Sequence, residues 1–69
     1  MNLEEYRIAC GWSKKEMARR ADMDFNTLKK ALNGESIFMK TANKLAQAIS
    51  KELGRPVSFQ DIDGLNVRL

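Results

Sequence analysis

Basic side chains are concentrated in the middle of the chain, and they are the groups whose placement first suggests a chemistry. Residues 14–44 contain eight Lys or Arg and four Asp or Glu, whereas the rest of the chain contains four basic and five acidic residues. The positive charge therefore lies mainly on one segment of a protein with a formal net charge of +3. This placement favours a polyanionic partner, although net charge alone does not separate a nucleic acid from a membrane surface.

The residues needed for catalysis or metal binding are largely missing. The sequence has no His and a single Cys, and its four Gly residues form no glycine-rich phosphate loop. Asp61 and Asp63 are close in sequence, but they fit a capped turn better than a pair of catalytic carboxylates. We therefore expect a protein that is not an enzyme, with no metal, no cofactor and no small-molecule ligand.

A chain of 69 residues with 43% hydrophobic content is long enough for one small domain and too short for two. Cys10 has no partner for a disulfide and lies among apolar neighbours, which favours a reducing compartment. No segment approaches the ~20 apolar residues of a membrane span, and the N-terminus does not resemble a signal peptide. We expect a cytoplasmic protein with one domain over residues 1–65, followed by a tail at 66–69.

Apolar residues recur at helical spacing, and no stretch alternates for long enough to predict a strand. The sequence therefore predicts an all-α fold of five helices. Each inward face is defined by its apolar residues: Leu3, Tyr6 and Cys10; Met17, Ala18 and Ala21; Leu28, Ala31 and Leu32; Phe38, Ala42, Leu45, Ile49 and Leu53; Phe59, Ile62 and Leu65.

Capping residues mark where these helices begin and end. Ser13 and Glu16 have the spacing of a capping box, in which each side chain bonds the backbone of the other residue. Asp24 and Ser58 are further N-caps, while Gly11, the Asn33-Gly34 pair and Gly54 are stop signals. The second helix is expected to end near Ala21 and the third to begin after Asp24, so that three residues, 22–24, join them. The third helix is expected to stop at Asn33-Gly34.

Two short helices joined by such a turn have the organisation of a helix-turn-helix, with the small residue Ala18 at the crossing. From Gly11 to Gly34 the sequence resembles the Xre/Cro-like helix-turn-helix regulators, which include phage repressors. Lys14 to Ala21 resembles the supporting helix of that family, Met23 its apolar turn residue, and Leu28 and Ala31 its buried recognition-helix positions. The later residues Leu45, Ala46 and Ile49, and then Ser58 to Ile62, are similar to its closing helices.

The resemblance implies a compact five-helix bundle of the lambda-repressor-like type, with the helix-turn-helix (about 14–33) as its second and third helices. Three residues depart from the family pattern. Lys14 replaces a phosphate-binding Gln, and Asp22 replaces the turn glycine, a substitution that Asp tolerates because it enters the left-handed region more readily than most residues. Leu32 replaces the acidic partner of Arg7, so we expect Glu16 or solvent to serve Arg7 instead.

If the third helix enters the major groove, as the resemblance implies, its exposed side chains reach base edges. Asn26 is suited to adenine, Lys29 and Lys30 to guanine, and Phe25 to a thymine methyl group. Thr27 completes these base-readout candidates. Three alternatives stay open: Phe25 packs on its own domain, Thr27 serves only to start the helix, and the polar side chains form an ordinary solvated face. The candidates for phosphate binding are Lys14, Lys15, Asn33, Ser36 and Lys40, and Lys29 and Lys30 would also neutralise phosphates.

The resemblance thus implies a sequence-specific regulator of transcription that binds double-stranded DNA, acting as a repressor that occludes an operator. One recognition helix covers few base pairs, so we predict a homodimer on two half-sites. The apolar residues Leu65, Val67 and Leu69 give the tail either a dimer interface or a role in its own core. The alternative function is a protein-interaction module, such as the antitoxin of a toxin-antitoxin pair.

Overall fold

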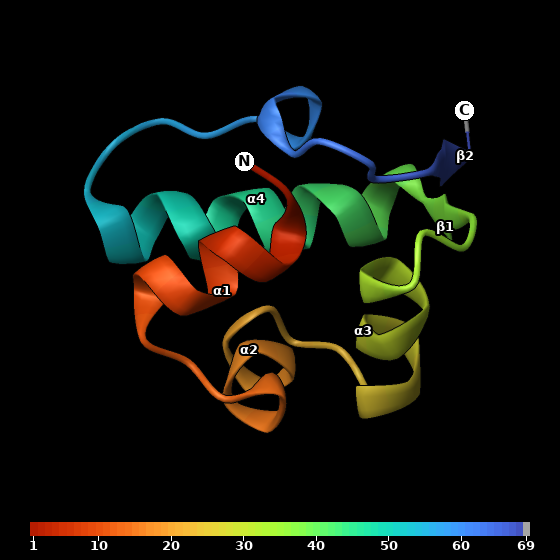
Figure 1. Ribbon diagram of the computed structural model, residues 1–69, viewed down its shortest axis with the longest axis horizontal. Helices are drawn as coiled ribbons and strands as arrows, with labels where there is room; N and C mark the ends of the chain where they lie inside the picture. The colour runs from red at the N-terminus through yellow and green to blue at the C-terminus, as the bar shows by residue number, and fades with distance from the viewer. Residues whose placement is uncertain (69) are drawn as a thin grey trace.

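The computed structural model describes residues 1–68, and this part of the chain contains four α-helices, one short 3₁₀ turn and two short strands (Figure 1). The elements in chain order are α1 (Leu3–Cys10), α2 (Lys14–Arg20), α3 (Phe25–Leu32), β1 (Ile37–Phe38), α4 (Met39–Leu53), η1 (Phe59–Asp61) and β2 (Val67–Arg68). The helical class is confirmed. The prediction of five helices is wrong, because the last of them is only the three-residue turn η1.

The turn η1 is capped as the sequence predicts but is not extended into a helix. The Ser58 hydroxyl accepts a hydrogen bond from the Gln60 amide, and the Asp61 carboxylate accepts one from the Ser58 amide, at 3.0 and 2.9 Å. Ile62 then adopts an extended conformation, and Gly64 has a positive φ of 77°. The chain therefore leaves the helical path after one turn, with the Ile62 side chain buried.

The tail pairs with the segment that precedes α4, a contact that the sequence did not predict. Strands β1 and β2 are parallel, with Ile37 opposite Val67 and Phe38 opposite Arg68. Two residues per strand are too few to produce a recognisable alternation in the sequence. Leu65 and Val67 are half-buried against the core of their own chain, which favours a core role for them. Leu69 lies outside the described residues, and the dimer interface stays a prediction.

Helix α4 is the longest element, and α1, η1 and both strands pack against it. Figure 1 shows α1 crossing in front of α4, with α2 and α3 together on one side and η1 on the other. The largest fully buried side chains come from three helices: Met17, Leu28, Leu45 and Ile49. Because α3 supplies one of them, burial of its inner face fixes its position against this core.

One residue of the predicted apolar stripe points the other way. Phe38 was expected to face inward, but its side chain is 61% exposed, whereas Ile37 beside it is buried. The reason is that Phe38 belongs to β1 and precedes α4, and successive side chains of a strand point to opposite sides. Ile37 therefore occupies the core position that helical spacing had assigned to Phe38.

Within residues 1–68, no helix has the length and apolar character that crossing a membrane requires.

Candidate nucleic-acid interface

The turn between α2 and α3 has the backbone conformation that the sequence predicts. Asp22 has a φ of +56°, in the left-handed region that favours glycine, so it does occupy the strained position of the turn. The Met23 amide donates to the Ala18 carbonyl at 3.0 Å, and Ala18 is buried where the two helices approach. Lys44 of α4 fastens the turn from outside, because its Nζ donates to the Asp22 carbonyl at 3.1 Å. The angle between α2 and α3 is thus held by backbone bonds and by α4.

Helix α2 begins with two exposed lysines, Lys14 and Lys15, and ends with Arg19 and Arg20, which pair with Glu16. The Ser13 hydroxyl accepts from the Glu16 amide at 3.1 Å, but the reciprocal half of the predicted capping box does not form. The Glu16 carboxylate instead accepts from Arg19 and Arg20, at 2.5 and 2.7 Å. These hydrogen bonds lower the pKa of Glu16 to about 2. Arg19 and Arg20 therefore have a carboxylate partner, whereas the side chains of Lys14 and Lys15 are exposed to solvent.

Arg7 links α1 to the start of the helix-turn-helix. It does not contact Glu16; its Nε donates to the Glu4 carboxylate at 2.9 Å, and one terminal nitrogen donates to the Trp12 carbonyl at 2.7 Å. The hydrogen bonds with Glu4 raise the pKa of Arg7 and lower that of Glu4. The partner that Leu32 does not supply therefore comes from within α1, and the bond to Trp12 holds the segment that leads into α2.

Helix α3 has a buried inner face and a polar outer face. Leu28 is fully buried and Ala31 nearly so, and the Asp24 side chain caps the helix by accepting from the Thr27 amide. The Thr27 hydroxyl also donates to the Asp24 carboxylate, and this bond lowers the pKa of Asp24. Thr27 is half-buried, and its hydroxyl takes part in the cap at the start of the helix.

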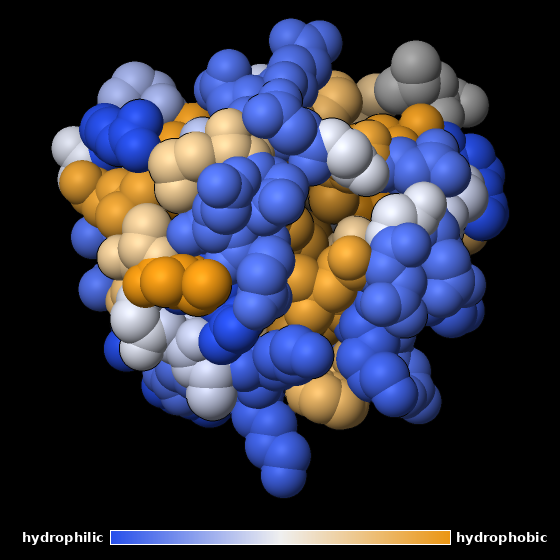
Figure 2. Space-filling view, viewed as in Figure 1, coloured by the Kyte–Doolittle hydropathy of each residue, from blue (hydrophilic) through white to orange (hydrophobic). Residues whose placement is uncertain are grey.

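The remaining base-readout candidates, Phe25, Asn26, Lys29 and Lys30, are exposed together on α3. Phe25 is 38% exposed, and the Lys29 Nζ lies 5.8 Å from the centre of its ring. Figure 2 shows hydrophilic side chains covering the region of α3 on the viewed face. The structure therefore places amide, ammonium and aromatic groups side by side on one exposed surface.

A hollow of about 260 Å³ lies between this surface and β1. Its lining residues come from four elements and the loop before β1: Thr27, Lys30, Ser36, Ile37, Phe38, Thr41 and Arg68. We call it the α3–β1 hollow. It brings together three of the predicted site residues, Thr27, Lys30 and Ser36. Sequence reasoning missed Phe38 and Arg68 because β1 and β2 gave no periodic signal. It missed Thr41 of α4 because only the tertiary packing places this residue beside α3.

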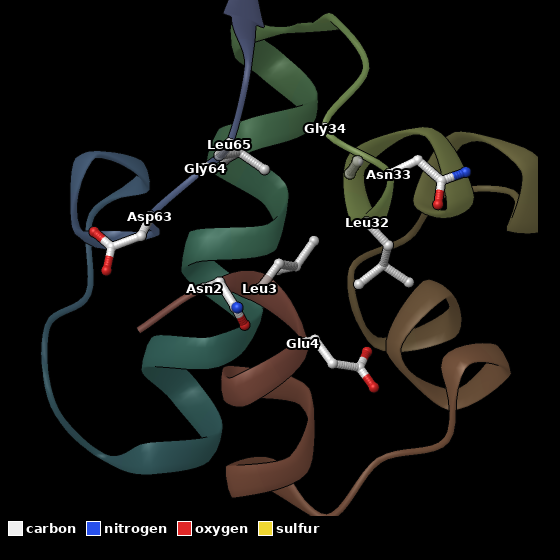
Figure 3. A pocket seen from close by; sticks show the side chains of 10 residues that line it. Asn2, Leu3, Glu4, Leu32, Asn33, Gly34, Asp63, Gly64 and Leu65 are labelled. Carbon is white, nitrogen blue, oxygen red and sulfur yellow. The ribbon is translucent and has the colours of Figure 1, made fainter.

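Two other phosphate candidates lie apart from this hollow. Asn33 borders a groove with Asn2, Glu4 and Asp63, and Figure 3 shows its carboxamide directed away from Asn2. Lys40 is exposed in the first turn of α4, a helix whose N-terminus has no side-chain cap. The amides of that turn are thus free of side-chain acceptors, an arrangement that suits phosphate.

Across residues 1–68, no three His, Cys, Asp or Glu side chains gather in a group that would hold a metal ion. Burial raises the pKa of the Cys10 thiol, which disfavours the thiolate that metal binding and nucleophilic chemistry require. The polar groups described above therefore suit hydrogen bonding and ion pairing.

Comparison with protein families matched residues 3–59 to a family model described as helix-turn-helix. The matched residues run from the start of α1 to the first residue of η1 and include all four helices described above. Searches of curated proteins and of solved structures gave no match.

Proposed function

Because this match makes the chain a member of the helix-turn-helix family of the Xre and lambda-repressor type, we propose that it is a sequence-specific repressor that occludes a DNA operator. Membership in this family establishes that the protein is a DNA-binding regulator of transcription. The single observation that carries the proposal of sequence-specific operator binding is that α3 has one buried face and one exposed polar face. Its inner face is fixed in the core by Leu28 and Ala31, while its outer face presents exposed polar groups.

The outer face of α3 has the chemistry needed to read bases in the major groove. The Asn26 carboxamide offers a donor and an acceptor, which match the N6 and N7 atoms of adenine. Lys29 and Lys30 donate to guanine O6 and N7, and the Phe25 ring suits a thymine methyl group. Thr27 contributes from the edge of the same surface, beside the α3–β1 hollow.

Phosphate binding is proposed for the exposed side chains that flank α3. Lys14 and Lys15 begin α2, and Lys40 lies in the first turn of α4, so each ammonium group lies near a helix N-terminus. Helix N-termini carry partial positive charge, which adds to the attraction of lysine for phosphate. Asn33 and Ser36 provide neutral donors at the end of α3. These contacts would orient the protein on DNA, while α3 supplies specificity.

We further propose that the protein acts in the cytoplasm as a homodimer. An eight-residue helix such as α3 is only about 12 Å long and therefore reads few base pairs. Two copies on half-sites about 34 Å apart would double the readout and give a symmetric operator. A bound dimer of this kind would occlude a promoter that overlaps its site.

Selection from a library of random DNA duplexes tests the proposed function. We expect enrichment of a two-fold symmetric site and a loss of its enrichment for the double variant Asn26→Ala, Lys30→Ala. Lys51→Ala is the matched control, because Lys51 is exposed in the last turn of α4 and is not a proposed contact. The control should enrich the parental site, and a promoter carrying that site should be transcribed less when the protein is added.

The proposal would be contradicted if the parental protein enriched no sequence, or if the double variant enriched the parental site unchanged. The first outcome would direct attention to the alternative, a protein-interaction module such as an antitoxin.

A further inference from the structure

We propose that Arg68 binds a phosphate of the DNA backbone beside α3, so that strand β2 forms part of the DNA interface. This inference rests on the proposed function and adds to it a residue outside the matched helix-turn-helix span, which ends at residue 59. The observations that carry it are the register of the two strands, the contacts of the guanidinium group and the lining of the α3–β1 hollow.

The strand register brings the tail to α3. Arg68 lies opposite Phe38 in the parallel pair of β1 and β2. The pairing is fixed by backbone bonds just before it, because the Ile37 amide donates to the Asn66 carbonyl at 2.8 Å. The Asn66 side chain also donates to the Gly34 carbonyl, at 3.4 Å. The strand pairing and the contacts of Asn66 therefore fix the position of Arg68.

The guanidinium group of Arg68 is held in a defined orientation. Its central carbon lies 4.6 Å from the centre of the Phe38 ring, a cation–π geometry. Its Nε donates to the Ser36 hydroxyl at 3.2 Å. The exposed Phe38 ring therefore has a structural role, because it supports the flat face of the Arg68 guanidinium. An arginine that is already oriented loses less side-chain entropy when it binds phosphate.

Hydrogen-bond donors remain available on the Arg68 guanidinium and on the Ser36 hydroxyl. A guanidinium has five N–H donors, and the bond to Ser36 uses only the one on Nε. No carboxylate of residues 1–68 forms an ion pair with Arg68. Ser36 accepts from Arg68, so its own proton is free to point toward a ligand. The terminal guanidinium nitrogens and the Ser36 hydroxyl can thus bond one anionic oxygen group together.

The chemistry of the α3–β1 hollow identifies that group as phosphate of the bound DNA. The hollow is lined by two cationic residues, Lys30 and Arg68, and by three hydroxyl residues, but by no acidic residue. Lys30 and Thr27 also belong to the surface of α3 that is proposed to read bases. A strand of DNA that passes α3 would therefore bring its backbone to the hollow.

The experiment compares Arg68→Gln with Arg55→Gln in binding a mixed-sequence DNA duplex over a range of salt concentrations. Arg55 is the matched control because it is an exposed arginine that follows the opposite end of α4. Removal of one phosphate contact per protomer should make the slope of log K against log salt less steep by about 0.9. Affinity near 50 mM salt should fall roughly tenfold for Arg68→Gln through the loss of that contact. Arg55→Gln should keep the parental slope.

Two results would overturn the inference while leaving the proposed function intact: a parental slope for Arg68→Gln, or an equal change in both variants. A parental protein that fails to bind the duplex at low salt would overturn the proposed function and this inference with it. Circular dichroism checks that each variant is folded. Should Arg68→Gln not fold, Arg68→Lys supplies the test, because it keeps the charge and must keep the parental slope; a shallower slope in a folded Arg68→Lys would also overturn the inference.

Discussion

Replacing Leu28 with Ala tests whether the inner face of α3 fixes its position. Leu28 is fully buried on this eight-residue helix, and a helix this short has little stability in isolation. A buried Leu→Ala change typically costs about 2–5 kcal/mol, because it removes apolar contact and leaves a cavity. A domain of 69 residues is expected to have a free energy of unfolding of roughly 3–10 kcal/mol. Leu28→Ala should therefore remove a large fraction of the total stability.

Asn26→Ala is the matched control on the same helix. Its side chain is exposed, so we expect the free energy of unfolding to change by no more than about 0.5 kcal/mol. Urea unfolding followed by circular dichroism measures the free energy of unfolding of both variants. The slope of this free energy against urea concentration should stay the same in each variant. A cost below about 1 kcal/mol for Leu28→Ala, or an equal cost for the two variants, would refute the description of α3 as a helix held by one face.

Substitutions at three further positions test the local features that orient α2 and α3. Ser13→Ala removes the hydroxyl that accepts from the Glu16 amide and should lower the free energy of unfolding by about 1 kcal/mol in urea titrations; an unchanged value would contradict the assigned cap. Glu16 has a pKa lowered to about 2 from its ordinary 4.5. Its ionised carboxylate therefore stabilises the folded protein above pH 4.5, and this stabilisation is lost as the pH falls toward 2. Glu16→Gln should therefore make stability less dependent on pH in this window, and a variant with the parental pH profile would show that the Glu16 pairs contribute nothing. Asp22→Val places a β-branched residue at a φ of +56° and should lower the melting temperature through a cost of about 1–2 kcal/mol. Asp22→Gly should leave the melting temperature near the parental one or above it. A lower melting temperature for Asp22→Gly than for Asp22→Val would contradict the backbone strain at this turn.

The helical part of the fold was predictable because its signals are local. Ser13 and Asp24 are N-caps, and Gly11 and Gly54 adopt the left-handed C-cap conformation. The inner faces of α2, α3 and most of α4 follow helical periodicity, so burial was also predictable there. Such features depend on residues within one or two turns of each other, and the sequence contains them directly.

Most of the features that were missed depend on contacts between distant segments. The β1–β2 pair joins residues 37 and 67, and no local pattern predicts it. Phe38 was assigned to the inner face because it continued the spacing of α4, but the strand geometry turned it outward. One missed contact is local: Arg7 pairs with Glu4, three residues earlier on α1, and the Glu16 carboxylate pairs with Arg19 and Arg20.

The candidate site divides in the same way. The outer face of α3 was predictable, since exposed residues follow once the buried ones are known. The part of the interface that three-dimensional structure adds is the α3–β1 hollow, where Phe38, Thr41 and Arg68 join the predicted residues. The separate position of Asn33, on a groove with Asn2 and Asp63, also required the structure.

The central claim is that the surface containing Lys14, Lys15, Lys40 and α3 binds DNA. Fluorescence anisotropy with a mixed-sequence duplex tests it most directly, because phosphate contacts need no operator. If the three lysines each neutralise one phosphate, log K should fall with log salt with a slope of about −3 or steeper per protomer. Negligible binding at low salt, or binding that does not respond to salt, would contradict the claim.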